Sequence, residues 1–246
     1  MTLSTRISQI APVDPSVRSA QPVVVALSSA GTVGTVTVAL TLAGRTGSLR
    51  GERVELVPIE PSFTVQLAES AAVDRSSYQY TFVPDGADAT AAYIDALIAD
   101  REAGSIVPFA QRHVATGRLV GCTRFMELRW WRGRDDPDEV EIGGTWLGAD
   151  VQRSAVNTES KLLMFTHAFE TWGVTRVALC TDERNQRSRA ALARIGATFE
   201  GVLHHHRQSW VIAEAGRPRN SALYAVTDGG WPGVKQRLVE RLAERP

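Results

Sequence analysis

The sequence predicts a mixed α/β or α+β domain, in which helices flank a central sheet. The expected elements run as strands first and then as strand, helix, strand, helix, strand, strand, an order typical of such sheets. Hydrophobic residues make up 43% of the 246 residues and charged residues 22%, as in ordinary globular proteins. This length can bury a proper core, and no internal repeat indicates a solenoid.

Periodicity and turn residues place the elements of the first half of the domain. Alternating apolar residues predict the first strand, and a proline opens the first helix. The second helix has one apolar face, with Ala91, Ile94, Leu97 and Ile98. In chain order we expect a strand over 53–59, a helix over 61–69, a loop over 76–86, a helix over 88–102 and a hairpin of 105–113 with 117–131.

The second half alternates strands and helices. Leu162, Phe165, Phe169 and Trp172 form one apolar stripe of a helix, which Gly173 ends. Asn157 and Thr158 are expected to cap the start of that helix. In chain order we expect strand 140–148, helix 158–172, strand 176–181, a helix that stops at Gly196, two strands, and an amphipathic helix over 231–242.

Residues 1–48 are expected to be an N-terminal extension, irregular or poorly ordered, before a domain over 49–246. The run from Val23 to Gly44 carries no charge and is long enough to suggest a membrane span. Serine, threonine and glycine interrupt it, so we do not expect it to cross a membrane. Its alternating residues are also compatible with a pair of strands.

Charge and cysteine content narrow the class of protein. Lys and Arg (27) balance Asp and Glu (27), which gives no overall attraction to nucleic acid or anionic lipid. Trp130 and Trp131 lie beside arginines, but the acidic residues that follow cancel that charge, so packing or an interface is expected there. Cys122 and Cys180 predict buried thiols in the cytoplasm, without a disulfide.

No metal site is expected. His204, His205 and His206 are adjacent, but strand alternation sends His204 and His206 to one face and His205 to the other. No cysteine or carboxylate next to them completes a ligand set. The three histidines are compatible with a place at the border of an acceptor pocket.

Two local features indicate a ligand. Gly143 and Gly144 are adjacent within a strand, which marks either a bulge, where a ligand pairs with the backbone, or a simple kink. The small and polar loop before the 158–172 helix leads into a helix N-terminus, where free N–H groups and the helix dipole favour a phosphate.

These segments together resemble the core of the GNAT N-acetyltransferase superfamily, in its RimJ/RimL-type branch. The matching runs are "GERVELVPIEP", "VGCTRFM", "EIGGTWL", "QRSAVNTESKLLMFTHAFE", "RVALCTDERNQRSRAALARIGATFEGVL" and "WPGVK". They cover about Leu49 to Leu242. The resemblance implies a mixed, mostly antiparallel sheet with a splayed, bulged strand. It also implies acetyl-CoA as donor and an amine as acceptor.

The resemblance assigns the cofactor residues by position. The family's pyrophosphate loop falls on Gln152, Arg153, Ser154, Ala155, Val156 and Asn157, with Thr158 next to it, and Ala155 and Asn157 replace the family's glycines. The bulged strand that pairs with pantetheine corresponds to Thr145, Trp146 and Leu147. Asn185 starts the helix beside the pantetheine and thiol end. Ser188 lies one turn further, near the departing thiolate.

The resemblance also implies direct attack of a neutral amine on the thioester, with a backbone N–H at the bulge holding the oxyanion. Glu141 is the first candidate for the base, and Ser188 for the acid toward the thiolate. Arg187 and Arg189 are interpreted as solvated cations on the helix face, with contact to a CoA phosphate as the alternative, and Lys161 as a surface residue.

Several questions stay open at this point. The acceptor is a protein N-terminal α-amine, a lysine side chain or a small amine. The alternative function is a regulatory module that binds acyl-CoA without turnover. A homodimer is expected by resemblance alone.

Overall fold

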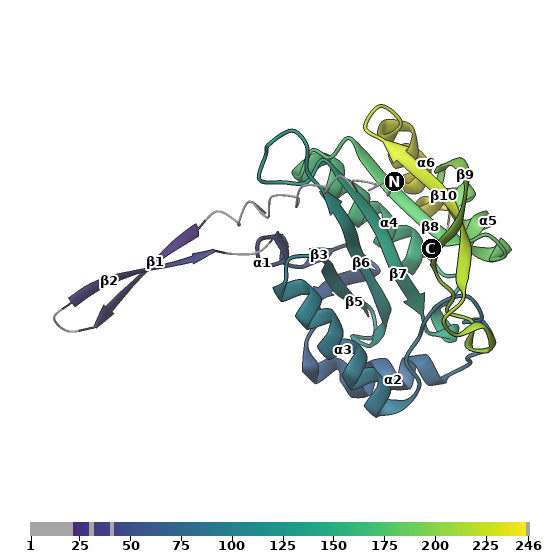
Figure 1. Ribbon diagram of the computed structural model, residues 1–246, viewed down its shortest axis with the longest axis horizontal. Helices are drawn as coiled ribbons and strands as arrows, with labels where there is room; N and C mark the ends of the chain where they lie inside the picture. Colours follow the sequence, from purple (N-terminus) through teal and green to yellow (C-terminus); the bar gives the residue numbers. More distant parts are fainter. Residues whose placement is uncertain (1–21, 30–31, 40–41, 245–246) are drawn as a thin grey trace, which may run out of the picture.

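The computed structural model describes residues 22–29, 32–39 and 42–244. Its main element is an eight-stranded sheet with the order β3-β4-β5-β6-β7-β8-β10-β9 (Figure 1). The strands are β3 (Leu49–Arg50), β4 (Val54–Pro58), β5 (Val107–His113), β6 (Leu119–Arg129), β7 (Glu139–Leu147), β8 (Arg176–Asp182), β9 (Thr198–Gln208) and β10 (Pro218–Thr227).

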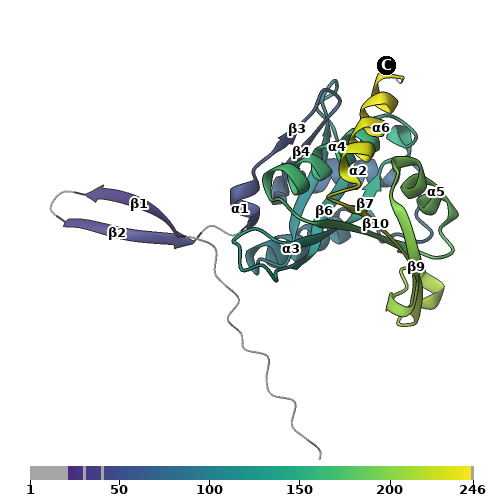
Figure 2. The same cartoon turned by 90° about the horizontal axis from the view of Figure 1, so that it is seen from above.

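Helices flank this sheet (Figures 1 and 2). They are α1 (Leu42–Thr46), α2 (Thr64–Ala72), α3 (Gly86–Glu102), α4 (Val156–Thr166), α5 (Gln186–Ile195) and α6 (Trp231–Ala243). Helices α2 and α3 pack on β6 and β5, whereas α4 packs on β3, β4 and α6. Helix α5 packs on β8, and α6 on β10. The predicted fold class, a mixed and mostly antiparallel sheet flanked by helices, is confirmed.

Two apolar clusters hold the layers together. The larger one contains Phe125 of β6, Met164 and Phe165 of α4, and Leu238 of α6. The smaller one lies under α2 and α3 and includes Trp146 of β7. Because successive side chains of a strand point to opposite faces, the same strands serve both clusters. Burial of apolar surface on both faces is the main force that stabilises the sheet.

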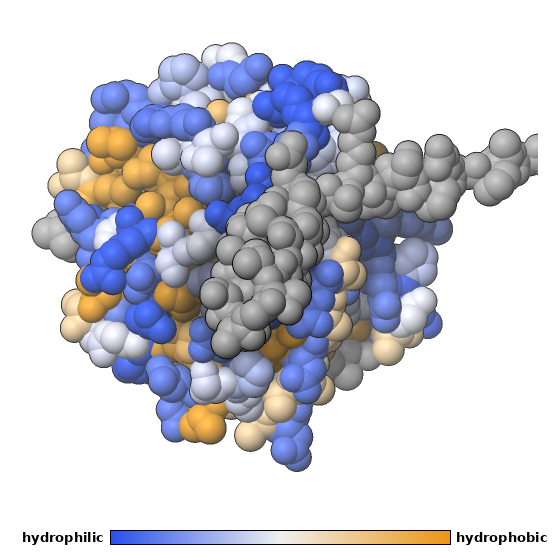
Figure 3. Space-filling model, turned by 90° about the vertical axis from the view of Figure 1, so that its left-hand side faces the viewer, coloured by the Kyte–Doolittle hydropathy of each residue, from blue (hydrophilic) through white to orange (hydrophobic). Residues whose placement is uncertain are grey.

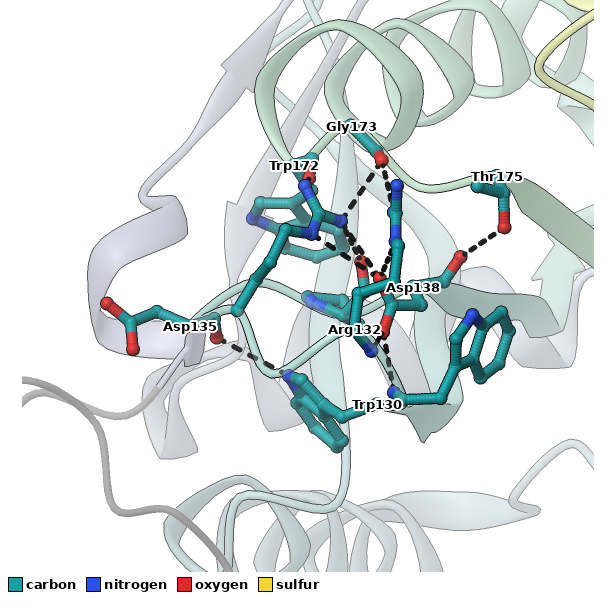
Figure 4. Close-up of polar contacts among 10 residues, drawn as sticks. Trp130, Arg132, Asp135, Asp138, Trp172, Gly173 and Thr175 are labelled. Atoms are coloured by element: carbon teal, nitrogen blue, oxygen red, sulfur yellow. Dashed lines mark hydrogen bonds and ion pairs between the residues drawn. The ribbon is translucent and has the colours of Figure 1, made fainter.

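One loop is organised by a single buried carboxylate (Figure 4). Oδ2 of Asp138, directly before β7, accepts from the backbone N–H groups of Trp131 and Arg132 at 2.6 and 2.7 Å. The guanidinium groups of Arg132 and Arg134 also bond to Asp138, and both donate to the Gly173 carbonyl beyond α4. Burial alone would raise the pKa of Asp138, but these donors hold it well below its usual range.

The tryptophans of this loop lie at the surface. Trp130 and Trp131 are exposed, while Arg132 and Arg134 are held by Asp138. On the side of the molecule drawn in Figure 3, apolar residues form patches bordered by polar ones. Exposed apolar surface of this kind is common in folded proteins and assigns no partner.

The segment before the domain contains regular elements. Strands β1 (Pro22–Ser29) and β2 (Thr32–Ala39) form an antiparallel hairpin, a two-stranded sheet separate from the main one. In α1, Leu42 and Ala43 are buried in the larger apolar cluster. No helix within the described residues is long and apolar enough to cross a membrane. The expected boundary at residue 48 stays a prediction.

The predicted caps and faces differ from the structure in two places. Helix α4 begins at Val156 with Ala155 as N-cap, not at the expected Asn157 and Thr158, and it ends in a π-helical turn, His167–Thr171. The local reason is Ser154, whose hydroxyl accepts from the N–H of Val156 at 3.2 Å and so starts the helix earlier.

The expected alternation of the histidines is also wrong. A register shift lies between the Arg219 and Ser221 positions of β10, where β9 carries extra residues, and His205 has a left-handed φ of 48°. This irregularity breaks the two-residue period. His204 and His205 are exposed, and His206 is half-buried.

Candidate acetyl-transfer site

The sheet separates between β7 and β8. These parallel strands pair with each other only through Glu139–Glu141 and Arg176–Ala178, and along the rest of the two strands β7 pairs only with β6 and β8 only with β10 among the described residues. Further along β7, Gly144 has φ 57°, and the register against β6 shifts between Cys122 and Arg124. The predicted bulge is therefore present. Backbone groups of β7 beyond Glu141 lie along the opening between the two strands.

The backbone conformation at the bulge favours glycine, and the Arg124 side chain lies close to it. A left-handed φ is strained for residues with a Cβ, and a Cβ at position 144 would lie 2.8 Å from the Arg124 guanidinium. The next residue, Thr145, shares a hydrogen bond of 2.8 Å with Thr123 of β6. These contacts hold the bulged strand in one conformation.

Lys161 of α4 lies under the bulge. Its Nζ donates to Thr145 Oγ1 at 3.0 Å, and only 4% of the residue is exposed, so the expectation of a surface residue is wrong. The reason is that α4 turns this position toward the sheet. Burial lowers the pKa of Lys161 to about 7, because a charged ammonium loses its hydration there.

A buried amide also supports the bulged strand from the side of α4. The Nε2 of Gln111 donates to the Cys122 carbonyl at 3.1 Å and to the Trp146 carbonyl at 3.3 Å. Its Oε1 accepts from Ser160 of α4 at 2.6 Å. Gln111 thus links β5, β6, β7 and α4 through one fully buried side chain.

The carbonyl of Leu147 is occupied by protein groups. It accepts from the Tyr78 hydroxyl at 2.9 Å and from Gln152 Nε2 at 2.8 Å. A carbonyl oxygen has two lone pairs, so both of its acceptor positions are used. Gln152 also donates to Ser77 Oγ at 2.9 Å, which ties the loop before α4 to the loop after α2.

The N-terminus of α4 presents the expected donors. Its first turn has N–H groups without partners inside the helix, and of these the N–H of Val156 bonds to the Ser154 hydroxyl, while the N-cap Ala155 has no polar side chain. Arg153 adopts a left-handed φ of 65°, which turns the loop toward the helix start. Oδ1 of Asn157 is buried and has no hydrogen-bond partner among the described residues. The free N–H groups of this terminus can donate to an anionic ligand, and the Asn157 oxygen can accept from an amide.

Helix α5 starts as expected. Asn185 is its N-cap, and its Oδ1 accepts from the N–H of Ser188 at 3.0 Å, which leaves the amide nitrogen as the donor. Ser188 is half-buried in the first turn. Arg187 is exposed and donates to the Ser77 carbonyl at 2.7 Å. Arg189 is half-buried and bonds to Tyr224 and Glu183, so it is not freely solvated as expected.

Glu141 lies on the other face of β7. Its neighbour Ile142 points to the α4 side, so alternation directs Glu141 away from α4. Both of its oxygens accept from Arg207 of β9, at 2.8 and 2.7 Å, and the carboxylate is buried. Arg207 also donates to Glu127 at 3.2 Å. Glu141 is therefore one partner of a buried, bidentate ion pair.

A thiol and an imidazole lie beside this pair. The Cys180 Sγ of β8 is 3.9 Å from His206 Nδ1. Burial and the nearby Glu141 charge raise the pKa of Cys180, so the thiol stays protonated. Burial and the Arg207 charge lower the pKa of His206, so its imidazole is neutral at pH 7.

The expected site residues therefore form two groups. Those of the loop, the bulge and α5 meet at the open end of the β7–β8 separation, joined by bonds among Leu147, Gln152 and Arg187. Glu141 lies on the opposite face of β7 from Thr145. Sequence reasoning missed Tyr78 and Gln111, whose only signal was polarity in a loop and in a buried strand. Within the described residues no group of His, Cys, Asp and Glu can hold a metal ion.

Similar structures share this architecture. A GCN5-related N-acetyltransferase from Brucella melitensis has 24% identity and a TM-score of 0.68, over 78% of this chain and 84% of that chain. RimJ from Mycobacterium smegmatis, in complex with CoA-disulfide, has 20% identity and a TM-score of 0.63, over 76% and 88%. The Microcin C7 self immunity acetyltransferase MccE, in complex with acetyl-CoA and AMP, has 16% identity and a TM-score of 0.59, over 72% and 93%.

At these identities the three structures show similarity of fold alone. The comparison with curated proteins found no match. The model of the acetyltransferase (GNAT) domain family matches residues 53–198, which is more than half of the chain and contains the bulged strand, the α4 terminus and α5. The chain thus belongs to the GNAT acetyltransferase family and is an acyl-CoA-dependent N-acetyltransferase.

Proposed function

We propose that the protein transfers an acetyl group from acetyl-CoA to a primary amine, a protein N-terminal α-amine or a small-molecule amine, by direct attack. The amine nitrogen forms a bond to the thioester carbonyl carbon, the C–S bond breaks, and the thiolate leaves. The observation that carries the proposal is the separation of β7 from β8 beyond Glu141, with the Gly144 bulge at its edge. Unpaired strand edges can bind an extended, amide-bearing ligand.

The cofactor residues proposed from the sequence fit such a ligand. Thr145, Trp146 and Leu147 offer backbone groups along the opening, and the donor amide of Asn185 lies at the start of α5. The N–H groups at the α4 terminus suit a pyrophosphate. The residues assigned to this terminus are Gln152, Arg153, Ser154, Ala155, Val156, Asn157 and Thr158.

The occupied carbonyl of Leu147 refines this assignment. Because Tyr78 and Gln152 use both of its acceptor positions, we propose that a ligand pairs with Leu147 through its N–H, or displaces one of the two side chains. The unsatisfied Oδ1 of Asn157 offers an acceptor nearby.

Glu141 and Ser188 keep the proton-transfer roles proposed for them. The acceptor arrives as an ammonium, so a base must take one proton before attack. Since Arg207 holds both oxygens of Glu141, we propose that the incoming ammonium replaces one of these bonds as it gives up its proton. Ser188 is the proposed donor to the thiolate.

Two relatives give support from their ligands. RimJ from M. smegmatis was solved with CoA-disulfide and MccE with acetyl-CoA. The alternative, a regulatory module that binds acyl-CoA without turnover, is not favoured by membership in an acetyltransferase family. The homodimer and the cytoplasmic location stay predictions.

The first experiment is calorimetric binding of acetyl-CoA to the wild type, Asn185→Ala and Asn185→Ser. Serine keeps the N-cap oxygen but lacks the amide donor. If the amide binds the cofactor, both variants lose about tenfold in affinity, the effect of one hydrogen bond. If Asn185→Ser binds like the wild type, Asn185 only caps α5. A wild type that does not bind acetyl-CoA contradicts the proposed function.

The second experiment tests Glu141. We expect Glu141→Gln to bind acetyl-CoA normally and to lower kcat for thiol release by about 100-fold, the size typical of a general base. The conservative partner variant Arg207→Lys keeps a cation beside Glu141. Equal loss of kcat at all pH values in both variants would mean that Glu141 acts only by holding Arg207.

A further inference from the structure

Two polar side chains of β10 are buried without an oxygen or nitrogen acceptor for the Arg219 Nε or the Ser221 hydroxyl within the described residues. Arg219 is 8% exposed and Ser221 is fully buried. The Arg219 Nε has no hydrogen-bond partner within the described residues, and there the Ser221 hydroxyl faces only the weak acceptor Cys180, on whose thiol it acts. Burial of a polar group without a hydrogen bond costs free energy, and burial of a cation without a counter-charge costs more. Such groups in a native structure call for an explanation.

Other arginines of the same region differ from Arg219. Arg207 bonds to Glu141 and Glu127, as described above. Arg184 bonds to Asp182 and Glu214, with its closest contacts at 2.8 and 2.6 Å. Arg219 forms no ion pair within the described residues, although its positive charge lowers the pKa of Asp182. The structure thus supplies carboxylates to two arginines and leaves the third without one.

The register places Arg219 and Ser221 at the candidate site. Ser221 pairs with Asp182 of β8, and Arg219 pairs with Arg207 of β9, the residue that holds Glu141. Residues two apart on a strand point to one face, so the two donors share a face. The Arg219 charge also acts on Cys180 and His206, which border the ion pair of Glu141.

The residue between them is fully engaged. The amide of Asn220 donates to Glu183 at 2.8 Å, and its oxygen accepts from the N–H of His205 at 3.0 Å. Both the nitrogen and the oxygen of the Asn220 amide are therefore hydrogen-bonded to protein groups. The Nε of its neighbour Arg219, in contrast, has no partner within the described residues.

We propose that the amine acceptor also carries an oxyanion, a carboxylate or a phosphate, which Arg219 and Ser221 bind. This inference rests on the proposed function and names the class of its acceptor. A guanidinium and a hydroxyl donate to carboxylate or phosphate oxygens in charge-assisted hydrogen bonds. With the oxyanion held on β10, the ammonium of a short acceptor lies toward Cys180 and Glu141. The acceptor is thus an amino acid or an amino phosphate, rather than a simple alkylamine.

The test compares matched acceptors. β-Alanine and O-phosphoethanolamine carry a primary amine and an oxyanion, and propylamine carries the amine alone. Thiol release from acetyl-CoA is measured with each, for the wild type and for Arg219→Gln. The matched control is Arg217→Gln, which removes an exposed cation next to β10. We expect the wild type to prefer one of the two anionic amines by about tenfold or more in kcat/KM.

We expect Arg219→Gln to remove that preference through a higher KM and to leave propylamine within about twofold, while Arg217→Gln behaves as the wild type. The preferred compound distinguishes a carboxylate from a phosphate. Thiol release without preference, or an equal loss for all three amines in Arg219→Gln, overturns the inference and leaves the proposed function standing.

A stability measurement separates binding from a structural role. Without an acceptor, Arg219→Gln removes an unpaired buried charge, so we expect Tm to stay equal or rise. A fall of more than about 4 °C would show that Arg219 supports the fold and would overturn the inference. If no amine gives thiol release, calorimetry measures the binding of β-alanine and O-phosphoethanolamine to the CoA-saturated wild type and to CoA-saturated Arg219→Gln. Binding that Arg219→Gln abolishes then supports the inference while the proposed function fails, and no binding overturns both.

Discussion

Lys161 shows how one buried residue makes stability depend on pH. The pKa of Lys161 is lowered to about 7 by burial, whereas an unfolded lysine titrates near 10.4. Between these values the unfolded chain binds more protons, so this group makes the free energy of unfolding rise with pH from about 7 to about 10. Below pH 7 the folded state holds Lys161 as a buried charge, so the free energy of unfolding lacks the contribution that this residue makes at higher pH.

We therefore expect Lys161→Met to be more stable than the wild type at pH 6, by on the order of 2 kcal/mol, and to lack this rise. Urea unfolding at pH 6, 7.5 and 9 measures it. Lys235, the other lysine of the chain, is exposed and paired with Glu170, so Lys235→Met serves as control. Identical pH profiles of Lys161→Met and the wild type would mean that Lys161 is solvated.

Gly144 determines the local geometry of the opening. We expect Gly144→Ala to cost about 1–2 kcal/mol of stability, because alanine is strained at φ 57° and its Cβ meets Arg124. If a backbone N–H at the bulge holds the oxyanion of the reaction, we expect kcat for thiol release to fall more than tenfold in this variant. The affinity for acetyl-CoA should change less. Stability by denaturant and single-turnover kinetics measure the two effects. Unchanged kcat in a destabilised variant would limit the bulge to a structural role.

Asp138 and the two arginines that it binds join the β6–β7 loop to the segment after α4. The pKa of Asp138 is depressed, so its contribution to stability is present above the unfolded pKa of about 3.9 and is lost as pH falls below it. Two backbone N–H groups and two guanidinium groups donate to this one carboxylate, and both guanidinium groups also bond to Gly173, so removal of the charge affects both segments together.

We expect Asp138→Asn to lower the free energy of unfolding by about 3 kcal/mol at pH 7, as for a broken buried ion pair. The difference from the wild type should shrink below pH 4. Asp136→Asn is the matched control, since its contact with Arg45 lies near the surface at 3.3 Å. A constant difference from pH 7 to pH 3 would contradict the depressed pKa.

Helix α1 bears on where the folded domain begins. Leu42 and Ala43 of α1 are buried in the larger core, although they precede the boundary expected from the sequence. We expect a chain that starts at residue 42 to keep the wild-type Tm, and one that starts at 49 to lose several degrees, because it exposes the surface under α1. Thermal unfolding of both truncated chains measures this. Equal Tm values would support the boundary at 48.

Residue patterns predicted the order of strands and helices, the hairpin of β5 and β6, and either a bulge or a kink at Gly143 and Gly144. These features depend on backbone preferences and spacing within a few residues, which a sequence displays directly. The family resemblance added Asn185 as the start of α5, and the α4 terminus and the bulged strand as cofactor positions. Helix α4 starts two residues earlier than predicted, because the Ser154 hydroxyl accepts from the N–H of Val156.

Which charges meet depends on the tertiary structure. Glu141 and Arg207 are far apart in the chain, Lys161 turns toward β7, and Arg219 is buried without a carboxylate. Partners of this kind are set by strand order and register across the sheet, and no local pattern encodes them. The order β8-β10-β9 brings Arg207 and Arg219 to one face beside Glu141, and this placement underlies the acceptor class proposed for the protein.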